Sequence, residues 1–321
     1  MRRLAAKFAV IAAVAAIAGL WWLRQGDVVD VTIPSGLSAT QTGALLEQHG
    51  VVRFKMLFRL AAGLSGVDKK LKPGTYRLRR NMPLSSVLRE LKAGSAGVKV
   101  AVPEGFSAAQ IAQRLEAARV CSAADFRQFA ASRKLEGYLF PTTYYFEPGL
   151  GAEKAAQRMR EEFKRKIEPE YLALQGRRTA FTLHQMVTLA SIVEREAVLG
   201  DERPLIAAVY LNRLGKRMRL EADPTTQYAL GYWKKRLNSA DLRHSSPYNT
   251  YVHYGLPPGP ICSPGLESFR SALNPAKTDA LYFVADTTGG HIFSRTHDEH
   301  LKAKQSFKRA RRAIEQRLNV R

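Results

Sequence analysis

An uninterrupted apolar run near the N-terminus constrains this chain more than any other feature. It extends from Phe8 to Leu23 without a charge, and counted from Leu4 it reaches twenty residues. A helix of about 20 apolar residues is long enough to cross the hydrocarbon core of a bilayer. The sequence therefore predicts a cytoplasmic stub at residues 1–3 and a transmembrane anchor at residues 4–24.

The residues at the two ends of this run predict its orientation. Arg2 and Arg3 precede it, and positive charge before a span favours a cytoplasmic N-terminus. Trp21 and Trp22 lie at the far end, where aromatic rings prefer the membrane interface. A cleaved signal peptide is the alternative, because Ala16–Ala18 resembles a small-x-small cleavage site, but the apolar run continues beyond it. Under either interpretation, anchor or signal peptide, the rest of the chain is predicted to be exported.

The net charge of +22 over 321 residues indicates a polyanionic partner. Nucleic acid, anionic lipid and an anionic wall polymer would all fit. The chain has no zinc-finger spacing, no RNP-type aromatic signature and no phosphate-binding G-x-x-x-x-G-K-[ST] loop. Because export also separates the chain from nucleic acid, we predict a wall polymer and no nucleic-acid partner.

Few residues in the sequence are suited to metal ligation or cross-linking. Cys121 and Cys262 are far apart, and two buried apolar thiols explain them more simply than a disulfide, although the spacing does not decide their state. His297 and His300 form an i,i+3 pair with no third ligand nearby, which favours a solvated surface. We predict no metal site and no cofactor.

The exported part alternates short strands with amphipathic helices, which predicts an α+β fold. Ser38 has the position of a helix cap, and Gly50 that of a stop. Within a first module at residues 27–100 the expected elements are a strand at 27–36, helices from Ser38 to His49 and at 54–64, a strand at 75–78 and a helix at 85–92.

A weak internal repeat links this module to the next. Val31–Ala39 is echoed by Val100–Ala108, and each copy is followed two residues later by a glutamine. The shared pattern is a strand, a Pro-x-Gly turn and a serine-capped helix. Either a small α+β binding unit is duplicated, or a common turn recurs by chance.

A second α+β unit and a connector are expected at residues 101–180. The segment 137–146 is rich in aromatic residues and predicts a buried strand, with a platform for sugar rings as the alternative. Alternating charges at 153–166 predict a solvated connecting helix.

A helix capped by Thr182, expected from Leu183 to Leu199 and stopped by Gly200, carries the candidate chemistry. Glu194 and Glu196 lie at the two edges of its apolar stripe, which consists of Met186, Leu189, Ala190, Val193 and Ala197. A carboxyl that is partly desolvated has a raised pKa and can act as a general acid. Periodicity does not choose between the two, and both could instead be surface carboxylates paired with arginines.

The surrounding sequence resembles the YceG-like family of membrane-bound endolytic murein transglycosylases. The helix motif is Ala190-Ser191-Ile192-Val193-Glu194-Arg195-Glu196-Ala197. The blocks that follow it in order are Asn212–Leu214, Met218–Thr225, Ser246–Tyr251, Gly255–Ile261, Ser263–Gly265, Asn274–Lys277, Leu281–Asp286 and Gly289–Phe293, and the segment Lys72–Tyr76 also resembles the family.

The resemblance implies a LysM-like module at 27–100 and a catalytic domain at 181–321 with a lysozyme-like catalytic helix. It implies Glu196 as the catalytic residue. Candidate substrate contacts are Asp223, Thr225, Tyr248, Asn249 and Tyr251, although Asp223 and Thr225 could instead orient the helix. Glu221 departs from the family, in which Gln is frequent at this position. The implied location is the inner membrane, crossed once, with the catalytic region in the periplasm, and the implied partners are peptidoglycan strands and penicillin-binding synthases.

The implied reaction is that of a lyase, which would limit the length of nascent glycan strands. Glu196 would protonate the oxygen between MurNAc and GlcNAc, and would then accept the proton of the MurNAc 6-hydroxyl as a 1,6-anhydro ring closes. A muramidase that uses a second carboxylate and water is one alternative. A wall-binding scaffold without activity is the other, although the intact Glu196 motif argues against it.

Overall fold

The computed structural model describes residues 26–34, 36–68, 71–72, 74–94, 97–174, 181–234 and 236–319. The predicted stub and anchor lie outside these residues. In the part of the chain that is described, no helix combines the length and the apolar character that crossing a bilayer requires. The described residues form a mixed α+β fold with two compact units, the first up to Val100 with Tyr144–Gly149, the second containing Ala101–Thr143 and everything from Leu150.

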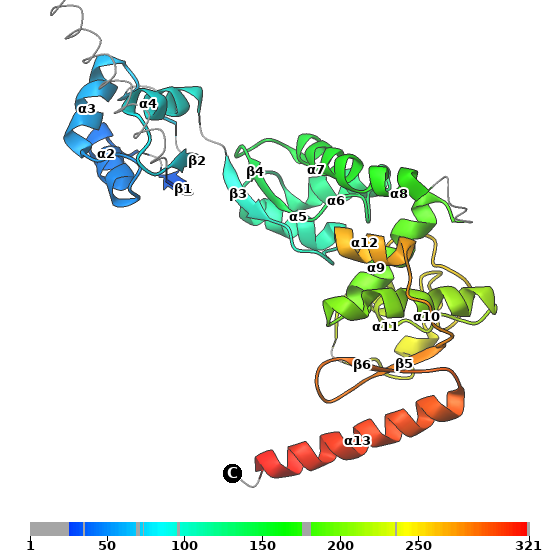
Figure 1. Ribbon diagram of the computed structural model, residues 1–321. Helices are drawn as coiled ribbons and strands as arrows, with labels where there is room; N and C mark the ends of the chain where they lie inside the picture. The colour runs from blue at the N-terminus through cyan, green and yellow to red at the C-terminus, as the bar shows by residue number, and fades with distance from the viewer. Residues whose placement is uncertain are drawn as a thin grey trace, which may run out of the picture. The chain divides into compact units, whose positions relative to one another are not determined.

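The first unit has the order strand, helix, helix, strand, helix (Figure 1). Its elements are β1 (Val28–Ile33), α2 (Ala39–Gln48), α3 (Lys55–Leu64), β2 (Gly74–Arg79) and α4 (Leu84–Ala93). The two strands pair antiparallel, with Val31 opposite Tyr76. The inward faces of the strands and helices bury a small core that includes Val31, Leu46, Phe58, Tyr76 and Leu91. The elements expected from the sequence are therefore confirmed here, with small shifts at their ends.

The second unit is mainly helical. The strands β3 (Val98–Ala101) and β4 (Thr143–Phe146) pair with each other, and apart from Ala101 and Thr143 their residues belong to the first unit. The other elements are α5 (Ala108–Ala117), α6 (Ala123–Ser132), α7 (Ala152–Lys166), α8 (Glu168–Leu174), α9 (Leu183–Glu196), the 3-10 helix η2 (Gly200–Glu202), α10 (Arg203–Gly215), α11 (Asp223–Leu230), the 3-10 helix η3 (Asp241–Arg243), α12 (Leu266–Leu273), the antiparallel pair β5 (Tyr282–Ala285) and β6 (His291–Ser294), and α13 (His297–Asn319).

The repeated pattern predicted from the sequence is present as local structure. Ser38 caps α2 and Ser107 caps α5, and in both helices the glutamine three residues later, Gln41 or Gln110, accepts a hydrogen bond from the backbone N–H of the capping serine. Such reciprocal bonds satisfy amides that a helix N-terminus otherwise leaves unpaired. Thr182 caps α9 in the same way.

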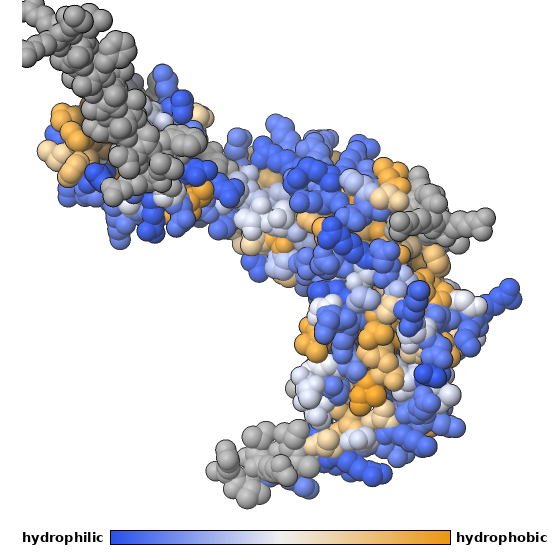
Figure 2. Space-filling model, in the orientation of Figure 1, coloured by the Kyte–Doolittle hydropathy of each residue, from blue (hydrophilic) through white to orange (hydrophobic). Residues whose placement is uncertain are grey.

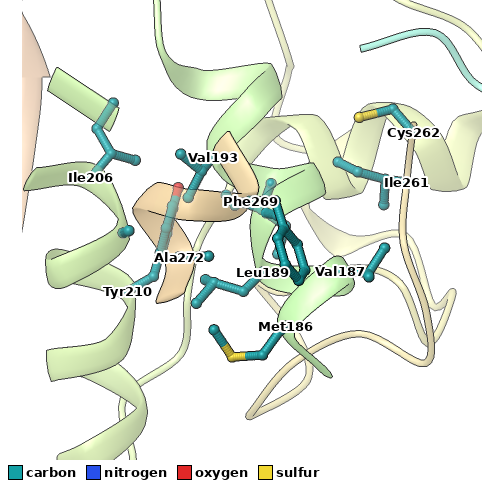
Figure 3. Packing of buried hydrophobic residues seen from close by; sticks show 14 of the residues in the cluster. Met186, Val187, Leu189, Val193, Ile206, Tyr210, Ile261, Cys262, Phe269 and Ala272 are labelled. Atoms are coloured by element: carbon teal, nitrogen blue, oxygen red, sulfur yellow. The ribbon is translucent and has the colours of Figure 1, made fainter. Parts of the chain in front are cut away.

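The core of the second unit is built around α9 (Figure 3). All eight residues from Met186 to Val193 are buried, so this part of the helix is enclosed rather than amphipathic. Tyr210 of α10 and Phe269 of α12 pack against it. A helix that is enclosed by other helices holds its last turn in a fixed position, and that turn carries both candidate glutamates.

Two predicted helices differ from the sequence-based expectation. The helix α9 ends at Glu196, because Ala197 adopts an extended conformation, and Val198 beyond it is 72% exposed without a core to pack on. The helix α7 is not a solvated connector: Met159 and Phe163 are fully buried in the second unit. Charges occupy only its outer face, which Figure 2 shows as hydrophilic. The sequence-based prediction considered the alternating charges of α7 and overlooked the apolar residues at helical spacing between them.

The remaining expectations concern single side chains. Most aromatic rings of segment 137–146 are buried, as the strand interpretation predicted. His300 is buried and stacks on Tyr282 with ring centroids 5.2 Å apart, so the prediction of a solvated histidine surface was wrong for this residue. The strand β5, which carries Tyr282, packs against α13, and this contact encloses His300. Cys121 and Cys262 are free thiols, both within the second unit.

Candidate active site

Glu196 is the last residue of α9, and α10 packs beside it. The Tyr210 hydroxyl donates a 2.9 Å hydrogen bond to Glu196 Oε1. Burial raises the pKa of Glu196 to about 7, and the negative charge of Asp223 adds to this, whereas the bond from Tyr210 and the charges of Arg195 and Arg213 lower it. Its carboxyl is therefore substantially protonated near neutral pH.

Tyr210 and Arg213 lie three residues apart on α10 and therefore on one face of that helix. The Arg213 side chain is nearly buried. It donates from Nε to the Leu281 carbonyl at 2.6 Å, from Nη1 to the Leu220 carbonyl at 2.9 Å, and from Nη1 to Glu221 Oε2 at 3.2 Å. The sequence-based prediction assigned neither residue a role in the site, although Arg213 lies inside the matched block Asn212–Leu214 and Tyr210 precedes it by three residues on the same helix.

Asp223 and Tyr251 meet beside Glu196. The Tyr251 hydroxyl donates to Asp223 Oδ1 at 2.6 Å. Burial, this hydrogen bond and the negative charges of Asp223, Glu196 and Glu221 raise the pKa of Tyr251. These couplings bring two of the predicted contact residues into the same cluster as the candidate acid.

Asn249 and Thr225 are fully buried behind this cluster. Asn249 Nδ2 donates to the carbonyls of Leu242 and His244 at 3.1 and 2.7 Å, and its Oδ1 accepts from the Tyr251 backbone at 3.0 Å. The Thr225 hydroxyl donates to the Ala222 carbonyl at 2.7 Å. Both side chains are occupied by the protein itself, so they hold the loop and helix that present Tyr251 and Asp223.

Tyr248 is not brought together with Glu196. Its ring lies 4.9 Å from that of Tyr228, centroid to centroid, and burial together with the charge of Glu136 raises its pKa. It lines a separate cavity at the opposite end of α9 with Glu136, Tyr228 and His184.

The two glutamates of the motif have different surroundings. Glu194 Oε2 accepts a 2.9 Å hydrogen bond from the Gly265 backbone, and its Oε1 lies 3.9 Å from Arg203 Nη2. Burial and the charge of Glu194 raise the pKa of the neighbouring Glu104. Glu194 thus ties α9 to the start of α12 and to α10, whereas Glu196 has a tyrosine hydroxyl as its partner.

This arrangement is suited to proton transfer by one carboxyl. A group whose pKa is near the working pH can donate a proton and recover it in the same cycle. Within the described ranges, no group of three or more His, Cys, Asp or Glu side chains could hold a metal ion.

Comparison with known proteins gives concordant matches. The model of the YceG-like family matches residues 31–306. The endolytic murein transglycosylase of Bacillus subtilis (strain 168) is 33% identical over 307 residues, covering 87% of this chain and 84% of that protein. The protein of the same name from Streptococcus pneumoniae (strain D39) is 29% identical, covering 84% of this chain and 56% of that protein. The crystal structure of a yceG-like protein of Listeria monocytogenes matches with a TM-score of 0.62 and 34% identity, covering 86% of this chain and 98% of that chain.

Proposed function

Because the chain belongs to the YceG-like family, we propose that it is a peptidoglycan lytic transglycosylase, a lyase that cuts the MurNAc–GlcNAc bond endolytically and limits the length of nascent strands. The names of the Bacillus and Streptococcus relatives support the substrate class and the type of reaction. The single observation that carries the proposal is Glu196, a half-buried, desolvated carboxyl with a pKa of about 7 and a tyrosine hydroxyl on one oxygen.

In the proposed reaction Glu196 acts twice. The protonated carboxyl gives its proton to the glycosidic oxygen, and the bond to the anomeric carbon of MurNAc breaks as an oxocarbenium-like centre forms. The carboxylate then takes the proton of the MurNAc 6-hydroxyl, whose oxygen bonds to the same anomeric carbon. One bond breaks and one forms, the proton returns to Glu196, no water is consumed, and the product carries a 1,6-anhydro ring.

Asp223 and Tyr251 are proposed to support the positive charge that develops during this step. A negative carboxylate near the reacting carbon lowers the energy of an oxocarbenium-like state. The bond from Tyr251 fixes the orientation of that carboxylate. Thr225 and Asn249 are proposed as positioning residues for this pair, because their polar atoms are used internally.

The parts outside the catalytic cluster suit the same activity. We assign the strand-helix-helix-strand order of the first unit to a LysM-like, glycan-binding module. The predicted anchor at residues 4–24 would hold both units at the outer face of the inner membrane, close to the strands made by penicillin-binding synthases.

A muramidase is the second candidate, and one observation favours it. The charge of Asp223 acts on Glu196, so a second carboxylate is present beside the candidate acid. A hydrolase needs such a group to form a covalent intermediate or to activate water. Its product would have an ordinary reducing end, one water heavier than the anhydro product.

Digestion of purified peptidoglycan by the detergent-solubilised protein tests the proposal. Mass analysis should find fragments that end in 1,6-anhydro-MurNAc. Glu196→Gln should lower the rate at least about a hundredfold with the fold intact, because an amide cannot donate the proton. Reducing ends would establish the muramidase. Near-native turnover in Glu196→Gln with loss in Glu194→Gln would overturn the assignment of the acid, and no fragments from several wall preparations would favour a scaffold.

A further inference from the structure

A cavity of about 500 Å³ lies at the other end of α9 from Glu196 and has no part in the proposed reaction. His184, in the first turn of α9, lines it, whereas Glu196 ends the same helix. Twelve residues of helix separate the two positions by about 18 Å. The cavity volume is in the range of small-molecule sites, which are roughly 300 to 1,000 Å³.

A half-buried carboxyl forms one wall of this cavity. Glu136 accepts hydrogen bonds from the Ala108 backbone N–H at 3.0 Å and from the Tyr228 hydroxyl at 3.2 Å. Burial raises the pKa of Glu136 to about 7, so near neutral pH its carboxyl can both donate and accept hydrogen bonds. Hydroxyl and acetamido groups of a sugar offer both kinds of partner.

Aromatic side chains form a second wall. The rings of Tyr228 and Tyr248 lie 4.9 Å apart and are tilted by 50°, which presents apolar faces beside polar hydroxyls. His184 is held by the Tyr138 hydroxyl at 2.8 Å and by the Pro258 carbonyl at 2.9 Å. With both ring nitrogens engaged, the imidazole is a fixed wall of the cavity rather than a mobile side chain.

The third wall is cationic. Arg127 and Lys134 line the cavity, and both residues are exposed. Positive side chains at the rim of an otherwise apolar and hydrogen-bonding cavity favour a ligand with a negative group. A neutral sugar would gain no attraction from these two charges.

We propose that this cavity binds an N-acetylated sugar that carries a carboxylate, which in the substrate of the proposed function is a MurNAc unit. The sugar face packs on the tyrosines, its hydroxyl or acetamido group bonds to Glu136, and its carboxylate faces Arg127 and Lys134. That carboxylate belongs either to the lactyl arm or to the attached peptide. The inference rests on the proposed function for the identity of the strand, and it gives the protein a second contact with that strand, away from the bond that is cut.

Calorimetric titration of the full-length Glu196→Gln protein in detergent tests the inference, since that variant binds without cutting. Three probes separate the possible sources of the negative group: chitobiose, the peptide-free disaccharide GlcNAc-MurNAc, and the same disaccharide with its peptide. Arg127→Ala with Lys134→Ala should weaken binding of the acidic probes about tenfold and leave chitobiose unchanged. Tyr248→Ala should weaken binding of all three.

The matched control is Lys302→Ala with Arg309→Ala, which removes the same charges from exposed positions on α13 and should leave every affinity unchanged. The inference would be overturned if the control lost as much affinity as the Arg127→Ala, Lys134→Ala variant. It would also be overturned if that variant kept its affinity for both acidic probes. A loss for the peptide-bearing probe alone would support it and identify the peptide as the source of the carboxylate. If the Arg127→Ala, Lys134→Ala variant loses affinity for the acidic probes but the native protein makes no anhydro products, the proposed reaction is refuted and the proposed cavity is not. If the native protein makes anhydro products but this variant keeps its affinity, the proposed cavity is refuted and the proposed reaction is not.

Discussion

Replacing Glu196 by Gln should make the protein more stable than the native chain at alkaline pH. This advantage of the variant should shrink as the pH falls. At a pH between the unfolded-state pKa and the raised folded-state pKa, the carboxyl keeps its proton in the folded chain but releases it in the unfolded chain. Stability is therefore lost as pH rises from about 4.5 through about 7. Gln carries no such proton, so the variant avoids this loss.

The size of the effect follows from the pKa of Glu196. A rise from 4.5 to about 7 corresponds to a cost of about 3 kcal/mol for ionising the carboxyl in the folded chain. This is an upper limit because the side chain keeps partial contact with solvent, and we expect about 2 kcal/mol. For a folded unit of this size, that corresponds to roughly 4 to 8 °C in Tm.

Thermal unfolding of both proteins at pH 5 and pH 8 measures the difference. We expect the difference in Tm, Glu196→Gln minus native, to be larger at pH 8 than at pH 5 by that amount. Glu136 remains in both proteins, so its own titration cancels in the comparison. Glu161→Gln, on the exposed face of α7, is the matched control and should show no such change. An equal difference at both pH values would refute the assignment of Glu196 as a protonated, desolvated carboxyl.

Further predictions concern the surroundings of the acid. Tyr210→Phe removes a hydrogen bond that lowers the pKa of Glu196, so the alkaline limb of the kcat/KM profile should move to higher pH, and an unmoved limb would contradict the contact. Asn249→Ala should cost about 3 kcal/mol in urea unfolding, because buried backbone partners lose their bonds; a loss below about 0.5 kcal/mol would contradict its positioning role. Glu221→Gln should retain activity within about twofold, since an amide oxygen can still accept from the arginine. The native protein should fractionate with inner membranes at full length, and a mature soluble form beginning at Gly19 would refute the anchor.

Local chemistry made much of the fold predictable. The caps at Ser38, Ser107 and Thr182 are local hydrogen bonds between residues three apart, so the local sequence indicates where those helices begin. The end of α9 was not predictable in the same way. The apolar stripe continues to Ala197, and only the absence of a core around Val198 ends the helix.

The choice between the two glutamates depends on partners that are distant in sequence. Periodicity places Glu194 and Glu196 at equivalent edges of one stripe. The structure distinguishes them because Gly265 bonds to Glu194 and Tyr210 bonds to Glu196. Tyr248 was predicted as a substrate contact together with Tyr251, and the structure places it in a different cavity, although only Asn249 and Thr250 lie between the two tyrosines.

The helix ends give the two carboxyls of the cluster opposite environments. Glu196 is the last residue of α9, and the C-terminal end of a helix carries partial negative charge, which disfavours a carboxylate. Asp223 lies in the first turn of α11, at a helix end that carries partial positive charge. Had α9 continued to Leu199, Glu196 would lie a turn away from that end. The early end of α9 therefore favours the protonated acid at Glu196 in the proposed reaction, while the start of α11 and the bond from Tyr251 hold the second carboxyl group, that of Asp223, beside it.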